Sequence, residues 1–395
     1  MSPGNETAAT PEAENDTLYV AIEISGKSWV IGVKSPVSEK IGLHSLGPAD
    51  KEGFRDLIEN QRAKAQQALN REVRVLCCYE AGYEGFWLAR WLEQEMSIET
   101  VVLDPASLLV NRKAKQRKTD RIDAKKMVRA LLAHDRGDAA VLSRVRVPSV
   151  EEEDRKRLLR ERRRLVKERT SLGNSIKGLL KLQGIYDLDP RAKEFEETFA
   201  DTVTAYGSPF PSRARQEIHR LVERLSLVQR QIAEVETERD AVVRQGEAIP
   251  APVAPEGSQE KAAAKIATLT QLKGIGANDA TLLEHEIFYR DFRNRRELAS
   301  WVGLTPAPWA SGDTQRDQGI GRDGPAWIRA LLIQMAWRWL HHQPDSALSK
   351  WFEERTAGAR GRIRRVMIVA VARKLLIALW RFSETGLVPT GAKLS

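Results

Sequence analysis

The chain has 395 residues, which is more than one compact core usually holds, so we expect two or three domains. No run of eighteen apolar residues and no basic-then-apolar leader are found, which argues against a membrane-spanning helix and a secretory signal. The 63 Lys and Arg residues outnumber the 54 Asp and Glu residues, and this net charge of +9 favours a polyanionic partner. The only two cysteines are adjacent, which excludes a disulfide framework and suits a reducing cytoplasm.

Residues 18–145 show the pattern of an α/β domain, after a polar tail (1–17) that we expect to be disordered. Apolar, β-branched segments predict strands at 18–24, 28–34 and 41–46, followed by a helix over 50–69. A strand at 73–79, a helix at 84–94, a strand at 99–103 and a helix from 119 follow. This is the order of a ribonuclease-H-like domain, although many α/β folds share it.

Two long charged helices predict a coiled-coil region over residues 150–245. In the first, leucines recur every seven residues from Leu158 to Leu179. In the second, an apolar stripe in steps of three and four, interrupted by Arg239, is formed by Ile218, Leu221, Leu225, Val228, Ile232, Val235 and Val242. The stripe fits either an intrachain hairpin or a dimerisation arm. A Pro/Ala-rich linker (246–260) and a mostly helical domain (261–395) complete the chain.

Four acidic residues in the first domain are candidate metal ligands. Glu23 lies in a strand whose neighbours predict burial, and Glu80 ends an apolar strand. Asp120 and Asp123 are three residues apart, so one face of a helix presents both. Carboxylates that converge from several elements can hold Mg²⁺. The alternatives are structural: Asp120 and Asp123 would form a capping box, and Glu80 would face water.

The residues around the two aspartates are strongly basic. From Arg112 to Arg129 nine cations accompany only those two acids, which differs from the mixed charges of an ordinary solvated helix face. Next to a carboxylate metal site, such cations would hold phosphates of a nucleic acid. The candidate phosphate-binding residues of this segment are Lys113, Lys115, Arg117, Lys118 and Arg121.

The last domain contains two glycine-containing segments of interest. The sequence LKGIGANDATLL fits the hairpin of a helix-hairpin-helix motif, in which Gly274 and Gly276 would let backbone N–H groups approach a phosphate, or an ordinary turn between helices. Residues 305–325 form a long polar stretch that we expect to be an active-site loop. Its arginines, Arg316 and Arg322, and the nearby Arg329 are candidate phosphate clamps.

Taken together, the segments VAIEIS, CYEAGYEGFWLARWL, KQRKTDRIDAKK, LKGIGANDATLL, ASWVGLTP and ASGDTQRDQGIGRDGPAWIRALL resemble the DEDD transposases of bacterial insertion sequences. This IS110 family includes bridge-RNA-guided recombinases and is related to Piv-type DNA invertases. The resemblance covers residues 18 to about 340. The family's first acid is usually Asp, whereas this chain has Glu23.

The resemblance implies a RuvC-like domain in which Glu23, Glu80, Asp120 and Asp123 bind Mg²⁺. It implies a coiled coil, and a C-terminal transposase domain in which Ser311 is the nucleophile. The expected function is cutting and rejoining of donor and target DNA by a homodimer or homotetramer in the bacterial cytoplasm, associated with the nucleoid. A structured noncoding guide RNA is a further partner within the family. Two alternatives remain: a metal-dependent nuclease or junction resolvase that uses water, and a non-catalytic nucleic-acid-binding relic.

Overall fold

The computed structural model describes residues 16–82, 85–105, 119–138, 141–247, 258–311, 314–321, 324–357, 359 and 361–395. The chain divides into two compact units. Unit 1 runs to Pro148, and unit 2 comprises Ser149–Ser395. Each unit is described by itself.

Unit 1 is built on a five-stranded sheet in the order β3-β2-β1-β4-β5. The strand β2 runs antiparallel to both of its neighbours, whereas β1, β4 and β5 are parallel to one another. Every strand that the sequence predicts for this domain is present, because each is a short β-branched or apolar segment that ends at a turn. The bounds are β1 (Thr17–Ile24), β2 (Trp29–Lys34), β3 (Ile41–Leu46), β4 (Arg74–Glu80) and β5 (Glu99–Leu103).

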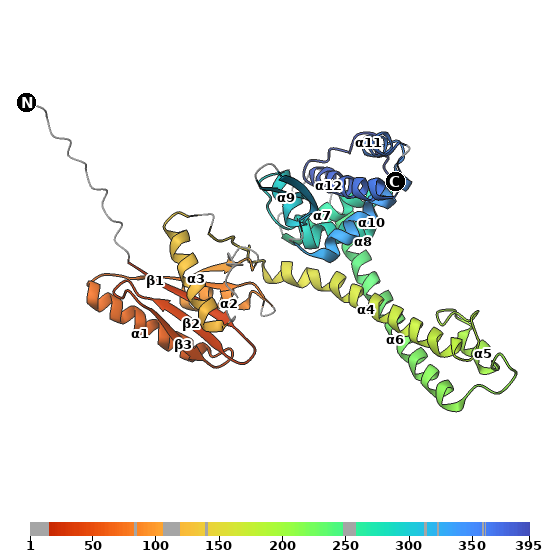
Figure 1. Ribbon diagram of the computed structural model, residues 1–395, viewed down its shortest axis with the longest axis horizontal. Coiled ribbons are helices and arrows are strands. Elements are labelled where there is room, and N and C mark those ends of the chain that lie inside the picture. Colours follow the sequence, from red (N-terminus) through yellow and green to blue (C-terminus); the bar gives the residue numbers. More distant parts are fainter. Residues whose placement is uncertain are drawn as a thin grey trace, which may run out of the picture. The chain divides into compact units, whose positions relative to one another are not determined.

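Helices cover both faces of this sheet (Figure 1). The helices α1 (Lys51–Leu69) and α2 (Trp87–Met96) share one core with alternate residues of β1 and β4. The helix α3 (Asp120–Asp135) packs on the residues that point the other way. Because neighbouring strand residues face opposite sides, Cys77 joins the first core and Cys78 the second. Both thiols are fully buried, and burial raises the pKa of each.

Unit 2 begins with a helical hairpin. Ser149 and Glu152 form a capping box that starts α4 (Val150–Lys181), and α5 (Phe195–Ala200) lies in the connection to α6 (Ser212–Glu247). Ion pairs from Arg162 to Glu236 and from Arg224 to Glu168 show that α4 and α6 run antiparallel. Much of the apolar stripe of α6, with Leu225 and Ile232 nearly fully buried, packs with α4 inside the chain. Of the two alternatives for the stripe, the structure therefore has the intrachain hairpin.

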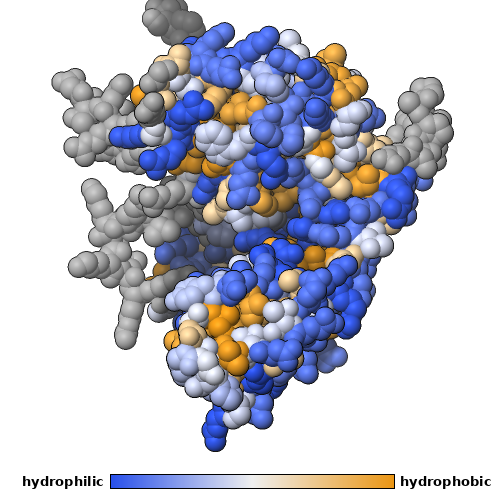
Figure 2. Space-filling view, turned by 90° about the vertical axis from the view of Figure 1, so that its right-hand side faces the viewer, coloured by the Kyte–Doolittle hydropathy of each residue, from blue (hydrophilic) through white to orange (hydrophobic). Residues whose placement is uncertain are grey.

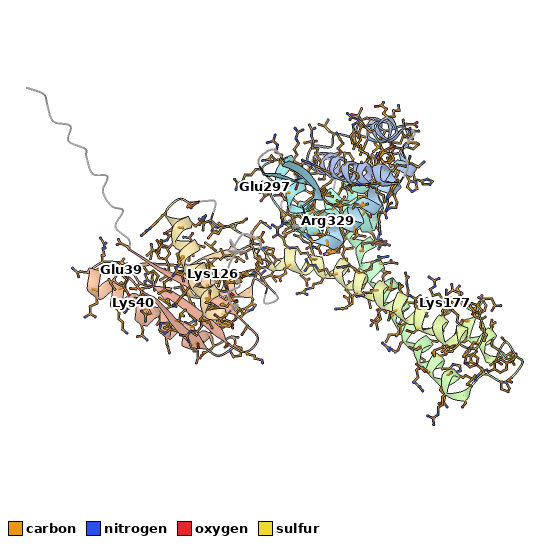
Figure 3. The ribbon with its side chains drawn as sticks, viewed as in Figure 1. Glu39, Lys40, Lys126, Lys177, Glu297 and Arg329 are labelled. Carbon is orange, nitrogen blue, oxygen red and sulfur yellow. The ribbon has the colours of Figure 1, made fainter. Side chains whose placement is uncertain are left out.

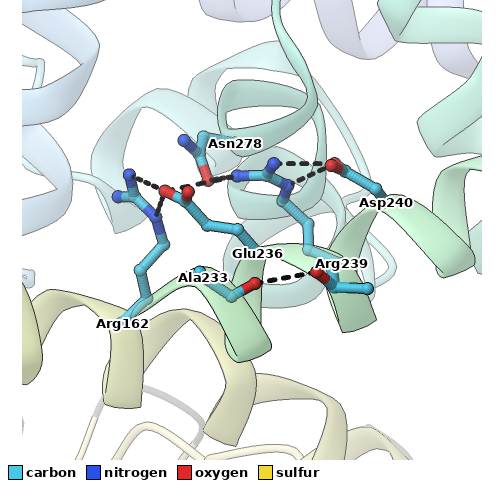
Figure 4. Close-up of polar contacts among 7 residues, drawn as sticks. Arg162, Ala233, Glu236, Arg239, Asp240 and Asn278 are labelled. Carbon is cyan, nitrogen blue, oxygen red and sulfur yellow. Dashed lines mark hydrogen bonds and ion pairs between the residues drawn. The ribbon is translucent and has the colours of Figure 1, made fainter. Parts of the chain in front are cut away.

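Arg239, the one charged residue in that stripe, connects the hairpin to the next part of unit 2 (Figure 4). Its guanidinium donates to Oδ1 of Asp240 and, at 2.5 Å, to Oδ1 of Asn278. Nearby, Arg162 Nε donates to Glu236 at 2.7 Å. Because these partners satisfy the buried charge, a polar side chain is tolerated where the heptad pattern favours an apolar one.

The rest of unit 2 is mostly helical and has its own core, with Leu283, Met335 and Leu376 at its centre. None of the helices in the described ranges is long and apolar enough to span a membrane. On the face that Figure 2 shows, hydrophilic residues dominate and hydrophobic ones form small patches. The elements are α7 (Ser258–Thr270), α8 (Ala277–Leu282), the π-helix η1 (Leu283–Phe288), α9 (Arg295–Trp301), β6 (Pro306–Ser311), β7 (Thr314–Ile320), α10 (Ala326–His342), α11 (Ala347–Thr356) and α12 (Arg362–Thr385).

Candidate functional site

Glu23 and Glu80 lie near the ends of two adjacent parallel strands. The register of β1 and β4 pairs Ile22 with Tyr79, so the next residue on each strand, Glu23 and Glu80, stands at the same level. Both continue the series of side chains that face α3, since Ala21 and Cys78, two residues before them, belong to that core. Glu80 is exposed, whereas Glu23 is half-buried at the second-to-last position of β1. The burial expected for Glu23 is therefore partial, because the strand ends one residue later.

The direction of α3 brings the two aspartates to the same edge. Asp135, at the end of the helix, accepts a hydrogen bond from Tyr19 near the start of β1. Ala124 lies over Gly32, which pairs with Ala21 further along β1. From Ala124 to Asp120 a helix advances ~6 Å, and from Ala21 to Glu23 a strand advances ~6.6 Å. The first turn of α3 and the ends of β1 and β4 are thus at one end of one face.

Asp120 and Asp123 do not form the capping box that was the structural alternative. The N-cap of α3 is Thr119, whose side chain makes no capping hydrogen bond, and Asp120 is the first helical residue. Asp120 is exposed and Asp123 half-buried. Local helix capping therefore does not account for either carboxylate.

The two carboxylate oxygens of Asp123 differ in their contacts. Lys126, labelled in Figure 3, lies 3.2 Å from Oδ1, while Oδ2 is buried and has no hydrogen-bond partner in the described parts of the chain. A buried carboxylate oxygen is costly to leave unpaired, and a cation at this edge would satisfy it. Carboxylates are also the donors that hard divalent cations prefer. The residues present therefore fit a divalent metal.

The side-chain positions do not themselves form a closed metal site. Among the residues that the structure describes, no three His, Cys, Asp or Glu side chains are grouped closely enough to hold a metal ion. Glu80 and Asp120 are exposed and can change rotamer, so their oxygens are not fixed by packing. The prediction that all four acids bind one metal centre stays a prediction.

The basic segment before α3 is only partly described. Lys113, Lys115, Arg117 and Lys118 lie outside the described residues. Arg121 is exposed in the first turn of α3, next to Asp120. The pairing of Lys126 with Asp123 was not anticipated, although the spacing of three residues within a helix is a signal for such a pair.

Ser311 belongs to unit 2 and lies in a β-hairpin, not in the long loop expected from the sequence. It is the last residue of β6, and its backbone pairs with Thr314 at the start of β7. The residues between them, 312 and 313, lie outside the description, as does Arg322. Backbone pairing places Arg316 opposite Trp309, and Arg329 is half-buried in the first turn of α10. The loop expectation was wrong because proline, glycine and charged residues hide the strand pattern here.

The glycine turn between α7 and α8 is tightly packed at one of its two glycines. Gly274 has φ +90°, and a Cβ there would lie 2.8 Å from Cβ of His342. Gly276 is the N-cap of α8 and has open space around it. A pocket of about 450 Å³ beside the turn is lined also by Arg239 and Arg338. Arg338 is already paired with Asp279, so the phosphate-binding role of the turn stays a prediction.

One buried polar cluster was not predicted. Glu284, His285 and Glu286 are consecutive in η1 and each is less than 5% exposed. Arg160 of α4 donates two hydrogen bonds, of 2.8 and 2.9 Å, to the carboxylate of Glu286. Burial raises the pKa of Glu284 to about 7 and lowers that of His285 to about 4. Three adjacent polar residues in an apolar segment were the available signal.

Comparison with known proteins gives matches to transposases in both units. A DEDD transposase family of IS110 type matches residues 20–184, and the family described as "Transposase IS116/IS110/IS902 family" matches residues 266–351. The protein y4rJ of Sinorhizobium fredii, which is named as a transposase, is 39% identical over 400 residues, 99% of each chain. The transposase for insertion sequence element IS1111A of Coxiella burnetii is 27% identical over 62% of this chain and 61% of its own.

The chain belongs to the IS110/IS116/IS902 family of transposases. It is accordingly an enzyme of DNA transposition, and its DEDD transposase match comprises the mixed α/β unit and the helix α4 that follows it.

Proposed function

We propose that the chain cuts and rejoins DNA strands with two groups: a Mg²⁺ site formed by Glu23, Glu80, Asp120 and Asp123, and a nucleophilic serine, Ser311. In this proposal unit 1 is a ribonuclease-H-like domain of RuvC type. The strand order β3-β2-β1-β4-β5, with β2 antiparallel, is the support for it. The central hairpin would be the family's coiled coil, and the α7–α8 segment its helix-hairpin-helix.

The observation that carries the proposal is the common edge of the four acids. They come from β1, β4 and α3, which are separated in sequence, and the sheet register and helix direction bring them to one end of one face. Apolar residues fill the part of that face that lies behind the acids. The unpartnered Oδ2 of Asp123 supports a role outside local structure.

When bound, Mg²⁺ would supply positive charge that stabilises the negative charge developing on a reacting phosphate. Residues of the chain would orient the metal ligands and bind the neighbouring phosphates. Lys126 orients Asp123 by holding Oδ1, and Arg121 together with the basic segment before it would bind neighbouring phosphates.

For Ser311 the proposed step is attack of its Oγ on a DNA phosphorus. A bond from Oγ to phosphorus forms, the bond from phosphorus to one sugar oxygen breaks, and that oxygen leaves with a proton. The sequence around Ser311 contains no histidine that could act as its base, so the carboxylates are the candidate acceptors of the Oγ proton. The support is the family membership and the place of Ser311 at the end of β6.

Partners follow from the same proposal. Donor and target DNA would be the substrates, and a structured noncoding guide RNA would be a further partner. The acids lie in unit 1 and the serine in unit 2, so a homodimer or homotetramer could combine the two groups from different subunits. The enzyme would act in the bacterial cytoplasm, at the nucleoid.

The experiment is strand transfer on labelled DNA with the variants Ser311→Ala, Asp120→Ala and their combination. Both single variants should lose recombination, and the double variant should be no worse than either, because the groups act as a unit. Wild-type reactions resolved on denaturing gels should contain a protein–DNA adduct that Ser311→Ala lacks. Mixing the two single variants should restore part of the activity if the site is shared between subunits.

Two results would replace the proposal. Normal cleavage by Ser311→Ala, with free DNA ends, would show a nuclease or junction resolvase that uses water. Metal-independent binding without any cleavage by the wild-type protein would show a non-catalytic relic. Circular dichroism of each variant separates loss of chemistry from loss of fold.

A further inference from the structure

A groove of about 1000 Å³ lies in the C-terminal part of unit 2. Its walls come from the start of α9, from α11, from one face of α12 and from the segment that follows α12. Most of these residues come after residue 351, where the family match ends.

The groove is lined by five cations and no acid: Arg295, Arg296, Arg373, Lys374 and Arg381. Four of the five are exposed, and Arg373 is half-buried. In the described ranges none of the five makes an ion pair with a carboxylate, whereas Lys265 of α7 is paired with Glu384. The α12 sequence has the same bias, since Glu384 is its one acidic residue among six Lys and Arg residues. In the described part of the chain, no ion pair therefore neutralises the positive charge of the groove.

The same groove has apolar and aromatic walls. Trp351 is half-buried, and the Lys374 ammonium lies 4.7 Å from the centre of its ring. Leu387 and Val388, at 63% and 42% exposure, leave apolar surface open to solvent at the rim. A duplex offers phosphates but keeps its base faces stacked inside, so these walls would have nothing to contact. A single strand offers both phosphates and the flat faces of its bases.

We propose that this groove binds single-stranded DNA, with the five cations on phosphates and Trp351 against a base. Excess positive charge selects a polyanion, and the apolar walls select an unpaired strand. DNA is the nucleic acid on which the family acts, so the identity of the sugar rests on the family, while the site rests on the groove. The groove lies apart from both Ser311 and the four acids in the sequence, and it would hold a strand that the chemistry does not touch.

The test measures binding of a fluorescent single-stranded oligonucleotide to the full chain in EDTA, at several salt concentrations. The variant carries Arg296→Gln, Lys374→Gln and Arg381→Gln, all on exposed side chains. For single strands, each phosphate contact contributes about 0.7 to the slope of log affinity against log salt. Losing three contacts should lower the slope by about 2 and weaken binding about 100-fold at 0.1 M salt. The matched control, Lys193→Gln with Arg213→Gln and Arg220→Gln, removes the same charge from exposed positions elsewhere in unit 2 and should bind nearly as wild type.

A second measurement locates the strand. Photo-crosslinking with an oligonucleotide that carries 5-iodouracil, followed by peptide mass spectrometry, should give an adduct in the peptide that contains Trp351. Equal binding by the groove variant and the control variant, or adducts confined to other peptides, would overturn the proposal. If the three groove substitutions weaken binding of the RNA oligonucleotide of the same sequence, or of the duplex, more than binding of the single-stranded DNA, the proposal is also overturned. Because no metal and no cleavage are needed, failure here leaves the strand-transfer result intact, and failure of strand transfer leaves this result intact.

Discussion

Gly32 shows how closely the helix that carries two of the acids approaches the sheet. A Cβ at this position would lie 3.0 Å from Cγ2 of Val128 and 3.3 Å from the carbonyl oxygen of Ala124. Asp123 immediately precedes Ala124, so a displacement here is passed directly to the candidate site. The absence of a side chain at residue 32 thus sets the position of α3 on β2.

We expect Gly32→Ala to lower the free energy of unfolding of unit 1 by about 1–3 kcal/mol, because the methyl group would overpack the contact. Strand transfer should fall further than this loss of stability explains, since the first turn of α3 moves with Ala124. Urea unfolding and the transfer rate at a temperature where the variant is folded measure the two effects. Gly26→Ala is the control, because nothing lies within 4 Å of a Cβ there. Unchanged activity with Gly32→Ala would show that the site tolerates the shift.

At the scale of elements, the π-helix η1 brings charged groups into the core of unit 2. Glu284 is favoured in its neutral form by burial, and its pKa is raised to about 7. His285 is also favoured in its neutral form by burial, and its pKa is lowered to about 4. Other elements contribute the charged side chains that act on Glu284, namely Lys265, Arg155, Glu384 and Glu152. The two shifts have opposite effects on how stability depends on pH.

A carboxyl with a raised pKa stabilises the fold fully below its unfolded value, about 4.5, and this contribution of ~3 kcal/mol is lost as the pH rises to about 7. An imidazole with a lowered pKa loses its contribution in the other direction, as the pH falls from 6.5 to about 4. Between pH 4.5 and 6.5 the two contributions largely offset each other. Glu284→Gln should therefore uncover a stability that rises with pH over this range, and should be more stable than wild type at pH 8. Denaturant titrations from pH 4 to 8 measure this, with the exposed Glu223→Gln as control. A variant that follows the wild-type curve would contradict it.

The hairpin of α4 and α6 is the second element with a direct test. Leu225 is 1% exposed between the two helices, whereas Leu227, on the same helix, is 42% exposed. Leu225→Lys would bury a charge without a partner and should destabilise the hairpin by several kcal/mol, at about 2 or more for the lost apolar contact alone. Leu227→Lys should change little. Limited proteolysis within residues 150–245 distinguishes them, and equal resistance of the two variants would show that the stripe is not buried in solution.

Sequence pattern predicts elements where one periodicity dominates. The strands of unit 1 and the stripe of α6 follow periods of two and three to four, so their positions agree with prediction. Hydrophobic periodicity alone does not predict β6 and β7, because Pro306, Pro308 and Gly319 weaken the strand pattern. Periodicity also does not predict the π-helix η1, because the burial of its acids depends on partners such as Arg160 that are distant in sequence.

The candidate site also has a part that the sequence predicts and a part that depends on tertiary contacts. The spacing of Asp120 and Asp123, the strand context of Glu23 and Glu80 and the family resemblance together select the four acids as candidates, and their role stays a prediction. Their common edge needed the parallel register of β1 and β4 and the direction of α3, which are contacts between distant segments. The cations of the groove are visible in the α12 sequence as a helix almost without acids, but the walls that α9 and α11 add are not.

For the whole molecule, the important feature is that each unit has its own apolar cores. Unit 1 packs two clusters on the faces of its sheet, and unit 2 packs one within the hairpin and one among its last helices. Among the described residues, each of these four clusters consists of residues of a single unit. We therefore expect more than one unfolding transition.

Scanning calorimetry should resolve these transitions, and core variants should assign them. Phe54→Ala, in the core below α1, should lower the midpoint of one transition and leave the other unchanged. Leu376→Ala, in the core of α12, should do the reverse. Each removes a fully buried side chain and should cost about 2–5 kcal/mol within its unit. A single transition that both variants shift equally would show that the units unfold together.

The two buried cysteines have a practical consequence for such experiments. Only the thiolate reacts with alkylating and disulfide reagents, and both Cys77 and Cys78 are held protonated and away from solvent on opposite faces of the same strand. No other cysteine exists in the chain, and both belong to unit 1. The labelling rate of the native protein thus reports how often the sheet that carries Glu23 and Glu80 opens, with no contribution from unit 2. Partial labelling would also reveal which side of the sheet separates first, since one thiol lies under α1 and α2 and the other under α3.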